Sequence, residues 1–266
     1  MLIEELDYYF DAVMRNDSDP VEVGAFTLFV SDAPFGYYAR PCFSYSEQMD
    51  AADLVALTKA CKEREIDLAL EWVHETDPGL GALAQAHGLN VHFFPLLVAQ
   101  AKDLKIPQAE GVTIRILSSD EPAIAQAVAV ANVSFGVGGT EVGSEGFAER
   151  DSAAGELSEK WMEYFRDHIR RELTAMAVVE SANGVLATAS CKPVGKFAEI
   201  VGVATLPSER RRGLGAAVTA FLASQLFAQG IETVLLSAED ENVARIYRQI
   251  GFRPVGTVGA TKKSEE

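Results

Sequence analysis

The stretch that decides the fold is residues 197–252, FAEIVGVATLPSERRRGLGAAVTAFLASQLFAQGIETVLLSAEDENVARIYRQIGF. Its first residues, 197–205, are apolar and β-branched enough to predict a buried strand, which Pro207 ends. A long apolar helix follows, then a second strand over residues 233–237 and a second helix. The order strand, helix, strand, helix indicates the α/β class.

A basic turn with two glycines, RRRGLG at residues 210–215, joins the first strand to its helix. Glycine lets the backbone approach a ligand closely, because no Cβ stands in the way. The free N–H groups of the first helical turn and the positive end of the helix dipole favour phosphate groups. We expect phosphate contacts from the backbone of this turn, with charge added by Arg210 and Arg212. The predicted contact residues are Arg210, Arg211, Arg212, Gly213, Leu214, Gly215 and Ala216.

Together with residues further along the chain, this turn resembles the GNAT superfamily of acyl-CoA-dependent N-acetyltransferases. The resemblance rests on Arg210-x-x-Gly213-x-Gly215 after a strand, and on Asn242, Tyr247 and Gly251-Phe252 at the family's usual distance. It covers about residues 112–261. It implies the GNAT fold, an α/β fold with a mixed sheet. It also implies transfer of acetyl from acetyl-CoA to a primary amine of a small molecule or peptide.

The resemblance implies a role for each remaining residue of the predicted site. The backbone of Val203, Ala204 and Thr205 would pair with the pantetheine arm of acetyl-CoA and supply the oxyanion donor. Asn242 would hold the arm from the other side. Tyr247 would protonate the departing thiolate, because a phenol with a pKa near ~10 suits a thiol with a pKa near ~8.5. The alternative for Tyr247 is that its ring only packs beneath the helix.

Glu199 is the candidate base. It shares a strand face with Val201 and Val203, an unusual place for a carboxylate unless the strand end is frayed. Residues 197–201 resemble the histone acetyltransferases of the family, in which this glutamate removes the proton of the amine. A free glutamate, with a pKa near ~4.3, is a poor match for an ammonium near ~10, so burial would have to raise its pKa or water would relay the proton. Glu199 and water both stay open as the base.

Two other functions fit the same residues. One is a non-catalytic acyl-CoA-binding or regulatory module that keeps the turn. The other is a histone-type protein acetyltransferase, which follows from the Glu199 segment alone. For the enzyme we favour direct attack by the amine over a covalent acyl-enzyme, because Cys191 lies outside the motif and no His–Cys arrangement is visible.

The N-terminal part repeats a portion of the pattern. Residues 66–71 and 83–89 parallel residues 231–236 and 246–252 in composition and order. We predict a degenerate GNAT-like domain over 1–104, a linker over 105–111 and a catalytic domain over 112–266. The repeat has lost the chemistry, since residues 46–50 contain no Gly-x-Gly and Ala84 stands where Tyr247 would be. The alternative is that two αβ segments look alike through their shared periodicity.

The other elements follow from periodicity and turn residues. Helices are expected at residues 1–16, 47–64, 78–87, 123–135 and 156–172, and strands at 23–30, 37–43, 66–73, 91–100, 112–117, 174–179, 185–189 and 255–260. Residues 136–155 are glycine-rich and acidic, which predicts a long loop. The resemblance to the GNAT family implies that this loop borders the acceptor site; the alternative is a loop that only covers the surface. After Phe252 the chain has room for only one strand, so a final strand that is usual in the family is missing. We therefore expect the N-terminal part to complete the edge of the sheet where that strand would lie.

Composition narrows the partners and the compartment. The chain has 266 residues, 48% of them hydrophobic, and a net charge of −16. This predicts a folded protein and argues against nucleic-acid and anionic-membrane partners. Three scattered cysteines and four histidines show no metal or redox spacing, so we expect no metal site and a reducing compartment. With no signal peptide pattern or membrane-length apolar run, a cytoplasmic location is expected, and nothing indicates an oligomer.

Overall fold

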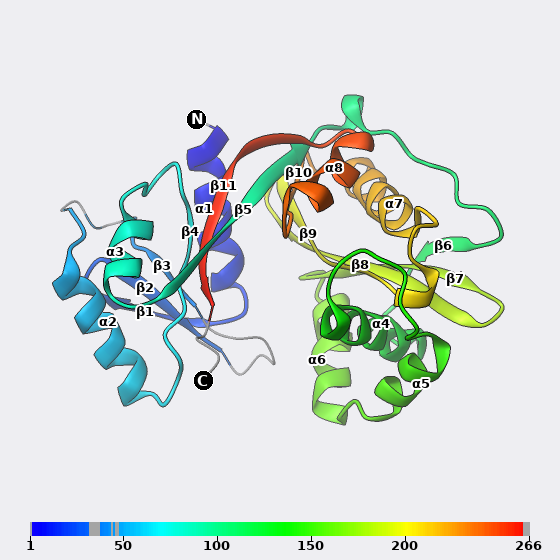
Figure 1. Cartoon of the computed structure of the whole chain (residues 1–266), viewed down its shortest axis with the longest axis horizontal. Helices are drawn as coiled ribbons and strands as arrows, with labels where there is room; N and C mark the ends of the chain where they lie inside the picture. The colour runs from blue at the N-terminus through cyan, green and yellow to red at the C-terminus, as the bar shows by residue number, and fades with distance from the viewer. Residues whose placement is uncertain (1, 32–37, 44, 46–47, 263–266) are drawn as a thin grey trace. The chain divides into compact units, whose positions relative to one another are not determined.

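The computed structural model describes residues 2–31, 38–43, 45 and 48–262 (Figure 1). The chain forms two compact units that alternate along the sequence. The first comprises Met1–Leu96, Ser237–Asp240 and Pro254–Glu266, and the second Leu97–Leu236 and Glu241–Arg253. The linear boundaries given above, 1–104, 105–111 and 112–266, stay a prediction.

The first unit combines three helices with a small antiparallel sheet. Its elements are α1 (Leu2–Arg15), β1 (Asp19–Val23), β2 (Phe26–Val30), β3 (Ala39–Pro41), α2 (Ala51–Glu63), β4 (Glu71–Val73), α3 (Leu80–Ala86) and the first residues of β5 (Asn90–Ala99). The small sheet has the order β1-β2-β3, and β4 pairs antiparallel with β11 (Arg253–Lys262). Phe26, Leu54 and Trp72, none of them solvent-exposed, belong to its core.

Two strand predictions in this unit need correction. The strand predicted over residues 23–30 is confirmed over Phe26–Val30 but wrong at its start, because Gly24, with φ +56°, turns the chain and Val23 pairs with Phe26 in a hairpin. The strand predicted over 66–73 shrinks to Glu71–Val73. Tyr37 and Glu47, where we expected a strand and a helix to begin, lie outside the described residues.

The second unit contains a mixed sheet between helices. Its elements are η1 (Ala101–Asp103), β6 (Thr113–Ile116), α4 (Ala123–Val137), α5 (Phe147–Gly155), α6 (Glu159–Arg170), β7 (Ala175–Ser181), β8 (Gly184–Val194), β9 (Phe197–Thr205), η2 (Pro207–Glu209), α7 (Leu214–Ala228), β10 (Thr233–Ser237) and α8 (Glu241–Gln249). The strand order is β5-β10-β9-β8-β7-β6. Strands β6, β7, β8 and β9 pair antiparallel with one another, whereas β9 pairs parallel with β10. The predicted α/β class with a mixed sheet is confirmed.

Strand β5 comes from the part of the sequence before the predicted linker. Its residues Leu97–Ala99 belong to the second unit, where β5 is the neighbour of β10. An N-terminal strand therefore completes this edge, as the short tail led us to expect.

Helices cover both faces of strands β6 to β9. Figure 1 shows α4, α5 and α6 on one face and α7 on the other. Met176 and Val178 of β7 share a buried cluster with Ile124 of α4. Since side chains alternate along a strand, Ala177 and Val179 point to the opposite face, and both are fully buried. Burial on both faces explains why residues 175–179 of β7 form a continuous apolar run.

The loop predicted over residues 136–155 was wrong in its second half, which is α5. The carboxylate of Glu149 accepts a hydrogen bond from the N–H of Gly146 at 2.7 Å, a typical helix start. Arg150, 2% exposed, donates to the carbonyl oxygens of Val185 at 2.8 Å and Asn183 at 2.9 Å. Helix α5 therefore anchors the turn between β7 and β8.

The ends of α3 and α8 are built alike. Leu89 N–H donates to the carbonyl of Ala84 at 3.0 Å, and Phe252 N–H donates to that of Tyr247 at 3.1 Å. Between them stand left-handed glycines, Gly88 with φ +89° and Gly251 with φ +105°. Ala84 therefore occupies the position of Tyr247 in a repeated helical turn, as the sequence comparison predicted.

Gly251 also lets the chain before β6 pack against the end of α8. A Cβ at Gly251 would lie 2.0 Å from the carbonyl oxygen of Asp103, and Lys105 N–H donates to the carbonyl of Ile250 at 3.0 Å. Gly230, with φ +97°, has no described atom within 4 Å of its Cβ position.

Gly251→Ala is therefore expected to lower the free energy of unfolding by roughly 1–3 kcal/mol more than Gly230→Ala, because only the first adds a clash to the backbone strain. Urea unfolding followed by circular dichroism measures both. Equal losses would show that the contact with Asp103 contributes nothing.

Candidate functional site

The end of β9 extends beyond its parallel neighbour. β10 pairs with β9 only from Phe197 to Glu199, whereas β9 continues to Thr205. The β8–β9 pairing shifts by one residue around Gly202, which has φ +62° and forms a bulge. In the described pairing, the backbone of β9 past Glu199 is therefore open on its β10 side.

The turn after β9 leaves helix α7 without a side-chain cap. Its N-cap is Gly213, in the left-handed conformation at φ +76° and ψ 7°, and Arg211 is also left-handed at φ +67°. Ala217 N–H donates to the carbonyl of Gly213. Over the described residues, the backbone N–H groups from Arg211 to Ala216 have no hydrogen-bond acceptor. Such a run of unpaired donors at a helix start is an arrangement that suits an anion.

The glycines of the turn have different surroundings. A Cβ at Gly213 would meet no described atom within 4 Å, so this residue faces open space. A Cβ at Gly215 would lie 3.5 Å from Thr205 Oγ1 and 3.8 Å from Val203 Cγ1. Gly215 therefore sets the start of α7 directly on the end of β9, which brings two predicted groups of contact residues together.

Helix α2 of the N-terminal repeat begins differently. The carboxylate of Asp50 accepts hydrogen bonds from the N–H groups of Ala52 at 2.7 Å and Asp53 at 3.4 Å. The carboxylate of Asp53 in turn accepts from Asp50 N–H at 3.0 Å. A negative side chain thus fills the place that a phosphate would take. These bonds are consistent with the predicted loss of a phosphate site in this half, which stays a prediction.

The arginine side chains of the turn do not act alike. Nη1 of Arg210 donates to the carbonyl oxygens of Gly138 at 2.9 Å and Glu141 at 3.1 Å, and Nη2 donates to that of Ser134 at 3.0 Å. Arg212 forms an ion pair with Glu209. The predicted role of Arg210 in adding charge at the phosphates finds no support in this geometry. The side chain of Arg211 is exposed and has no ion pair with any described residue.

Helix α8 presents Asn242 and Tyr247 on different faces. Asn242 is exposed, and its Oδ1 accepts a hydrogen bond from Arg245. Tyr247 is 8% exposed, with its ring centroid 6.1 Å from that of Phe252. Burial raises the pKa of the Tyr247 phenol far above its ordinary value. The phenol therefore keeps its proton at neutral pH, but its transfer to a thiolate is less favourable than for an ordinary tyrosine.

Glu199 lies inside the sheet. Its Cα partners are Lys192 on β8 and Leu235 on β10, and its side chain is half-buried. The carboxylate is therefore not at a frayed strand end, which was one interpretation of the sequence.

Ser134 was missed by the sequence analysis. Its hydroxyl donates to the carbonyl of Thr205 at 2.9 Å, and the residue is 4% exposed. It ties α4 to the last residue of β9. A single serine among the apolar residues of α4 is the only sequence signal that points to it.

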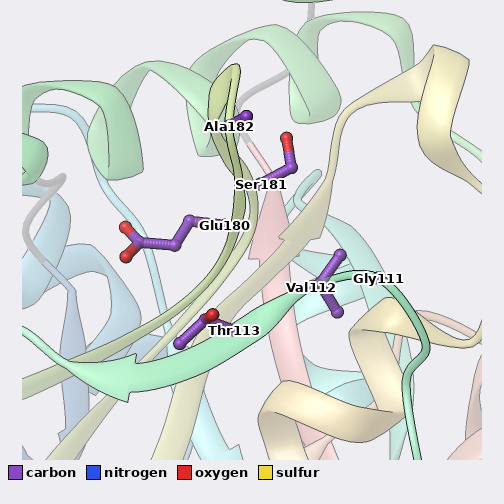
Figure 2. A pocket seen from close by; sticks show the side chains of 6 residues that line it. All are labelled: Gly111, Val112, Thr113, Glu180, Ser181 and Ala182. Carbon is purple, nitrogen blue, oxygen red and sulfur yellow. The ribbon is translucent and has the colours of Figure 1, made fainter.

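A pocket of about 400 Å³ lies away from all of these residues (Figure 2). It is lined by Gly111, Val112, Thr113, Glu180, Ser181 and Ala182. None of the predicted site residues contributes to it. Over the described residues, no group of three or more His, Cys, Asp or Glu side chains is placed to hold a metal ion.

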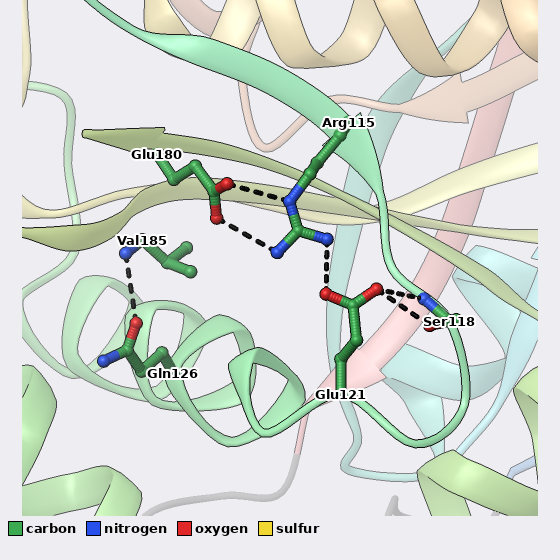
Figure 3. A network of polar contacts seen from close by, with 6 residues as sticks. All are labelled: Arg115, Ser118, Glu121, Gln126, Glu180 and Val185. Atoms are coloured by element: carbon green, nitrogen blue, oxygen red, sulfur yellow. Dashed lines mark hydrogen bonds and ion pairs between the residues drawn. The ribbon is translucent and has the colours of Figure 1, made fainter. Parts of the chain in front are cut away.

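The one charged residue of the pocket is already bound (Figure 3). Arg115 donates to both oxygens of Glu180, at 2.8 and 3.2 Å, and also pairs with Glu121. Although burial raises the pKa of Glu121, hydrogen bonds from Ser118 and Arg115 leave it below the ordinary value. This network fastens β6 to β7 and to the start of α4, so we assign it a structural role.

Comparisons with known proteins agree with this geometry. Residues 146–252 match the family model described as Acetyltransferase (GNAT) family. A GCN5-related N-acetyltransferase from Kribbella flavida is 23% identical, with a TM-score of 0.73 over 98% of this chain and 95% of that one. A tandem GNAT protein from the clavulanic acid biosynthesis pathway is 14% identical, with a TM-score of 0.58 over 92% and 80%.

One further solved structure adds to the pattern. A GCN5-related N-acetyltransferase from Sphaerobacter thermophilus is 16% identical, with a TM-score of 0.59 over 90% of this chain and 76% of that one. The comparison with curated proteins found no match. At these identities the structures establish the fold. The predicted GNAT fold, with a GNAT-like repeat in the N-terminal half, is confirmed.

The burial of Tyr247 predicts how its phenol titrates. In an alkaline titration, the tyrosinate absorbance of the unchanged protein minus that of Tyr247→Phe should stay near zero to beyond about pH 10, where ordinary tyrosines ionise. Because the folded-state pKa is raised, the stability from the protonated phenol is complete below the unfolded pKa and is lost as the pH rises further. A difference signal at or below about pH 10 would contradict the burial of the phenol.

Proposed function

We propose that this protein, whose residues 146–252 form a domain of the GNAT acetyltransferase family, moves an acetyl group from acetyl-CoA to a primary amine. The amine belongs to a small molecule or a peptide. The observation that carries the proposal is the row of unpaired N–H groups from Arg211 to Ala216, set on the open end of β9 by Gly215.

These groups would bind the donor. The N–H groups at the start of α7 would hold the pyrophosphate, and the open face of Gly213 gives it room. The exposed side chain of Arg211 is the one best placed to add charge. The backbone of Val203, Ala204 and Thr205 would pair with the pantetheine arm and stabilise the oxyanion, with Asn242 holding the arm from the other side.

Two proton transfers are needed. Tyr247, whose phenol is protonated at neutral pH, would give its proton to the departing thiolate. The proton of the attacking amine would go to Glu199 or to water. The half-buried position of Glu199, between two paired strands, supports the first possibility without excluding the second.

The proposed reaction is direct attack. Burial raises the pKa of the Cys191 thiol to about 12, and burial also raises that of Cys61. Thiols that stay protonated at neutral pH are poor nucleophiles, so neither would form an acyl-enzyme readily.

The proposal gives the N-terminal half a supporting role, because Asp50 caps the helix that would otherwise bind phosphate. We also propose a cytoplasmic location, because Cys42, Cys61 and Cys191 form no disulfide among the residues that the structure describes. In the described part of the chain no helix is long and apolar enough to cross a membrane. With a net charge of −16, neither nucleic acid nor an anionic membrane is a proposed partner.

The alternative is an acyl-CoA-binding module without catalysis. One observation favours it: a phenol as buried as that of Tyr247 is a weaker acid than the proposed proton donor needs to be.

Turnover separates the two functions. Thiol release from acetyl-CoA is measured with a panel of small amines and peptides, for the unchanged protein, Tyr247→Phe and the exposed control Tyr8→Phe. We expect Tyr247→Phe to lower kcat by about 10²-fold or more without weakening acetyl-CoA binding, because only the acid is lost. Tyr8, 66% exposed in the first unit, should have no effect. Binding of acetyl-CoA with no turnover of any amine would favour the binding module.

A further inference from the structure

Arg210 lies in the glycine turn, but its side chain points to another segment. Its guanidinium donates to three carbonyl oxygens at 2.9 to 3.1 Å, from Ser134, Gly138 and Glu141. The carbonyl of Ser134 also accepts from Gly138 N–H at 3.1 Å, at the end of α4. One cation thus binds a carbonyl of the last turn of α4 and two carbonyls of the chain that follows it, where a positive charge is favourable.

The same segment is fastened to the turn at two further points. Gly143 N–H donates to the carbonyl of Pro207 at 3.0 Å, and Ser208 N–H donates to that of Glu145 at 3.0 Å. Residues 138–146 therefore run beside residues 207–210 and are bonded to them through both backbone and side chain. We call residues 138–146 the latched segment.

Glycines allow this close approach. A Cβ at Gly143 would lie 2.8 Å from Pro207 Cβ, and a Cβ at Gly146 would lie 2.9 Å from Ser208 Oγ. Neither glycine has a left-handed φ among the described backbone angles, so what they provide is space and not conformational freedom. The glycine-rich composition of this region thus has a steric reason.

The latched segment lies close to the end of β9, because Gly143 N–H bonds the carbonyl of Pro207, two residues after the last residue of β9. Ser134, whose carbonyl binds Arg210, uses its hydroxyl to bind the carbonyl of Thr205. The segment therefore borders the open end of β9, where the acetyl group would lie under the proposed function. Under the proposed function, this places the latched segment beside the region that the amine would enter.

We infer that Arg210 is a positioning residue that fixes the latched segment as a wall of the acceptor site, and that it does not bind the donor's phosphates. The assignment to the acceptor site rests on the proposed function. The hydrogen bonds that hold the latched segment against residues 207–210 do not depend on it. A planar guanidinium with several fixed donors can bind three carbonyls at once, whereas a lysine ammonium on a flexible stem cannot reproduce this geometry.

The test combines amide hydrogen exchange with kinetics on the full chain. Arg210→Lys keeps the charge but loses the three-carbonyl geometry, and Gly143→Ala pushes the segment away without touching Arg210. In both variants, exchange of the backbone amides at position 143 and at Ser208 should rise by about tenfold or more, as expected for losing a hydrogen-bond network to a charged group. The KM for the amine should rise. The acetyl-CoA affinity should change by less than about threefold, which is less than the loss of one hydrogen bond to a charged group would cause.

Arg211→Lys is the matched control for exchange, because it makes the same chemical change at an exposed neighbour with no described partner. It should leave exchange in the latched segment unchanged. Unchanged exchange in both Arg210→Lys and Gly143→Ala would overturn the inference. It would also be overturned if these variants weakened acetyl-CoA binding and left the KM for the amine as it was.

The exchange measurement needs no substrate. If the unchanged protein turned over no amine, the proposed function would fail, and exchange alone would still decide whether Arg210 holds the segment. If Arg210→Lys does not fold, which a melting curve shows, exchange in Gly143→Ala still decides whether the segment is held against residues 207–210.

Discussion

Everything at the candidate site depends on the start of helix α7 being left uncapped. The first N–H groups of a helix usually donate hydrogen bonds to the side chain of a Ser, Thr, Asp or Asn at the N-cap. Here Gly213 takes that position in a left-handed conformation and offers no side chain. The bulge at Gly202 and the contact of Gly215 with Val203 and Thr205 then set these donors on the open end of β9. The candidate site therefore consists mainly of backbone groups, and side chains contribute less to it.

The two halves of the chain show how the same fold can keep or lose such a site. The turns that end α3 and α8 share three backbone hydrogen bonds at corresponding positions, so each helix leads into its following strand in the same way. The differences lie at two positions. Asp50 caps α2 with its own carboxylate, whereas Gly213 leaves α7 open, and Ala84 replaces Tyr247. A single carboxylate at a helix start is enough to exclude an anion, because it both neutralises the dipole and uses the N–H groups.

The sequence predicted those parts of the structure that depend on local chemistry. The bounds of β9 and β10 agree residue for residue, because apolar β-branched runs ended by Pro207 or a polar turn leave few alternatives. It failed at the hairpin around Gly24, where a run of apolar residues hid a turn. It also failed for Arg210 and Ser134, whose partners lie about 70 residues away in the sequence and depend on tertiary packing. The cap at Asp50 was also missed, since the helix was predicted to begin at residue 47, although the spacing Asp50-x-x-Asp53 is a local signal for it.

The most direct measurement is calorimetric titration with acetyl-CoA of the unchanged protein, Gly213→Glu and Gly230→Glu. Both variants add the same charge at a left-handed glycine with open space around it, but only Gly213 lies at the uncapped start of α7. We predict saturable binding by the unchanged protein and by Gly230→Glu, and loss of binding by Gly213→Glu. Binding that survives in Gly213→Glu, or no binding by the unchanged protein, would contradict a donor site at this helix start.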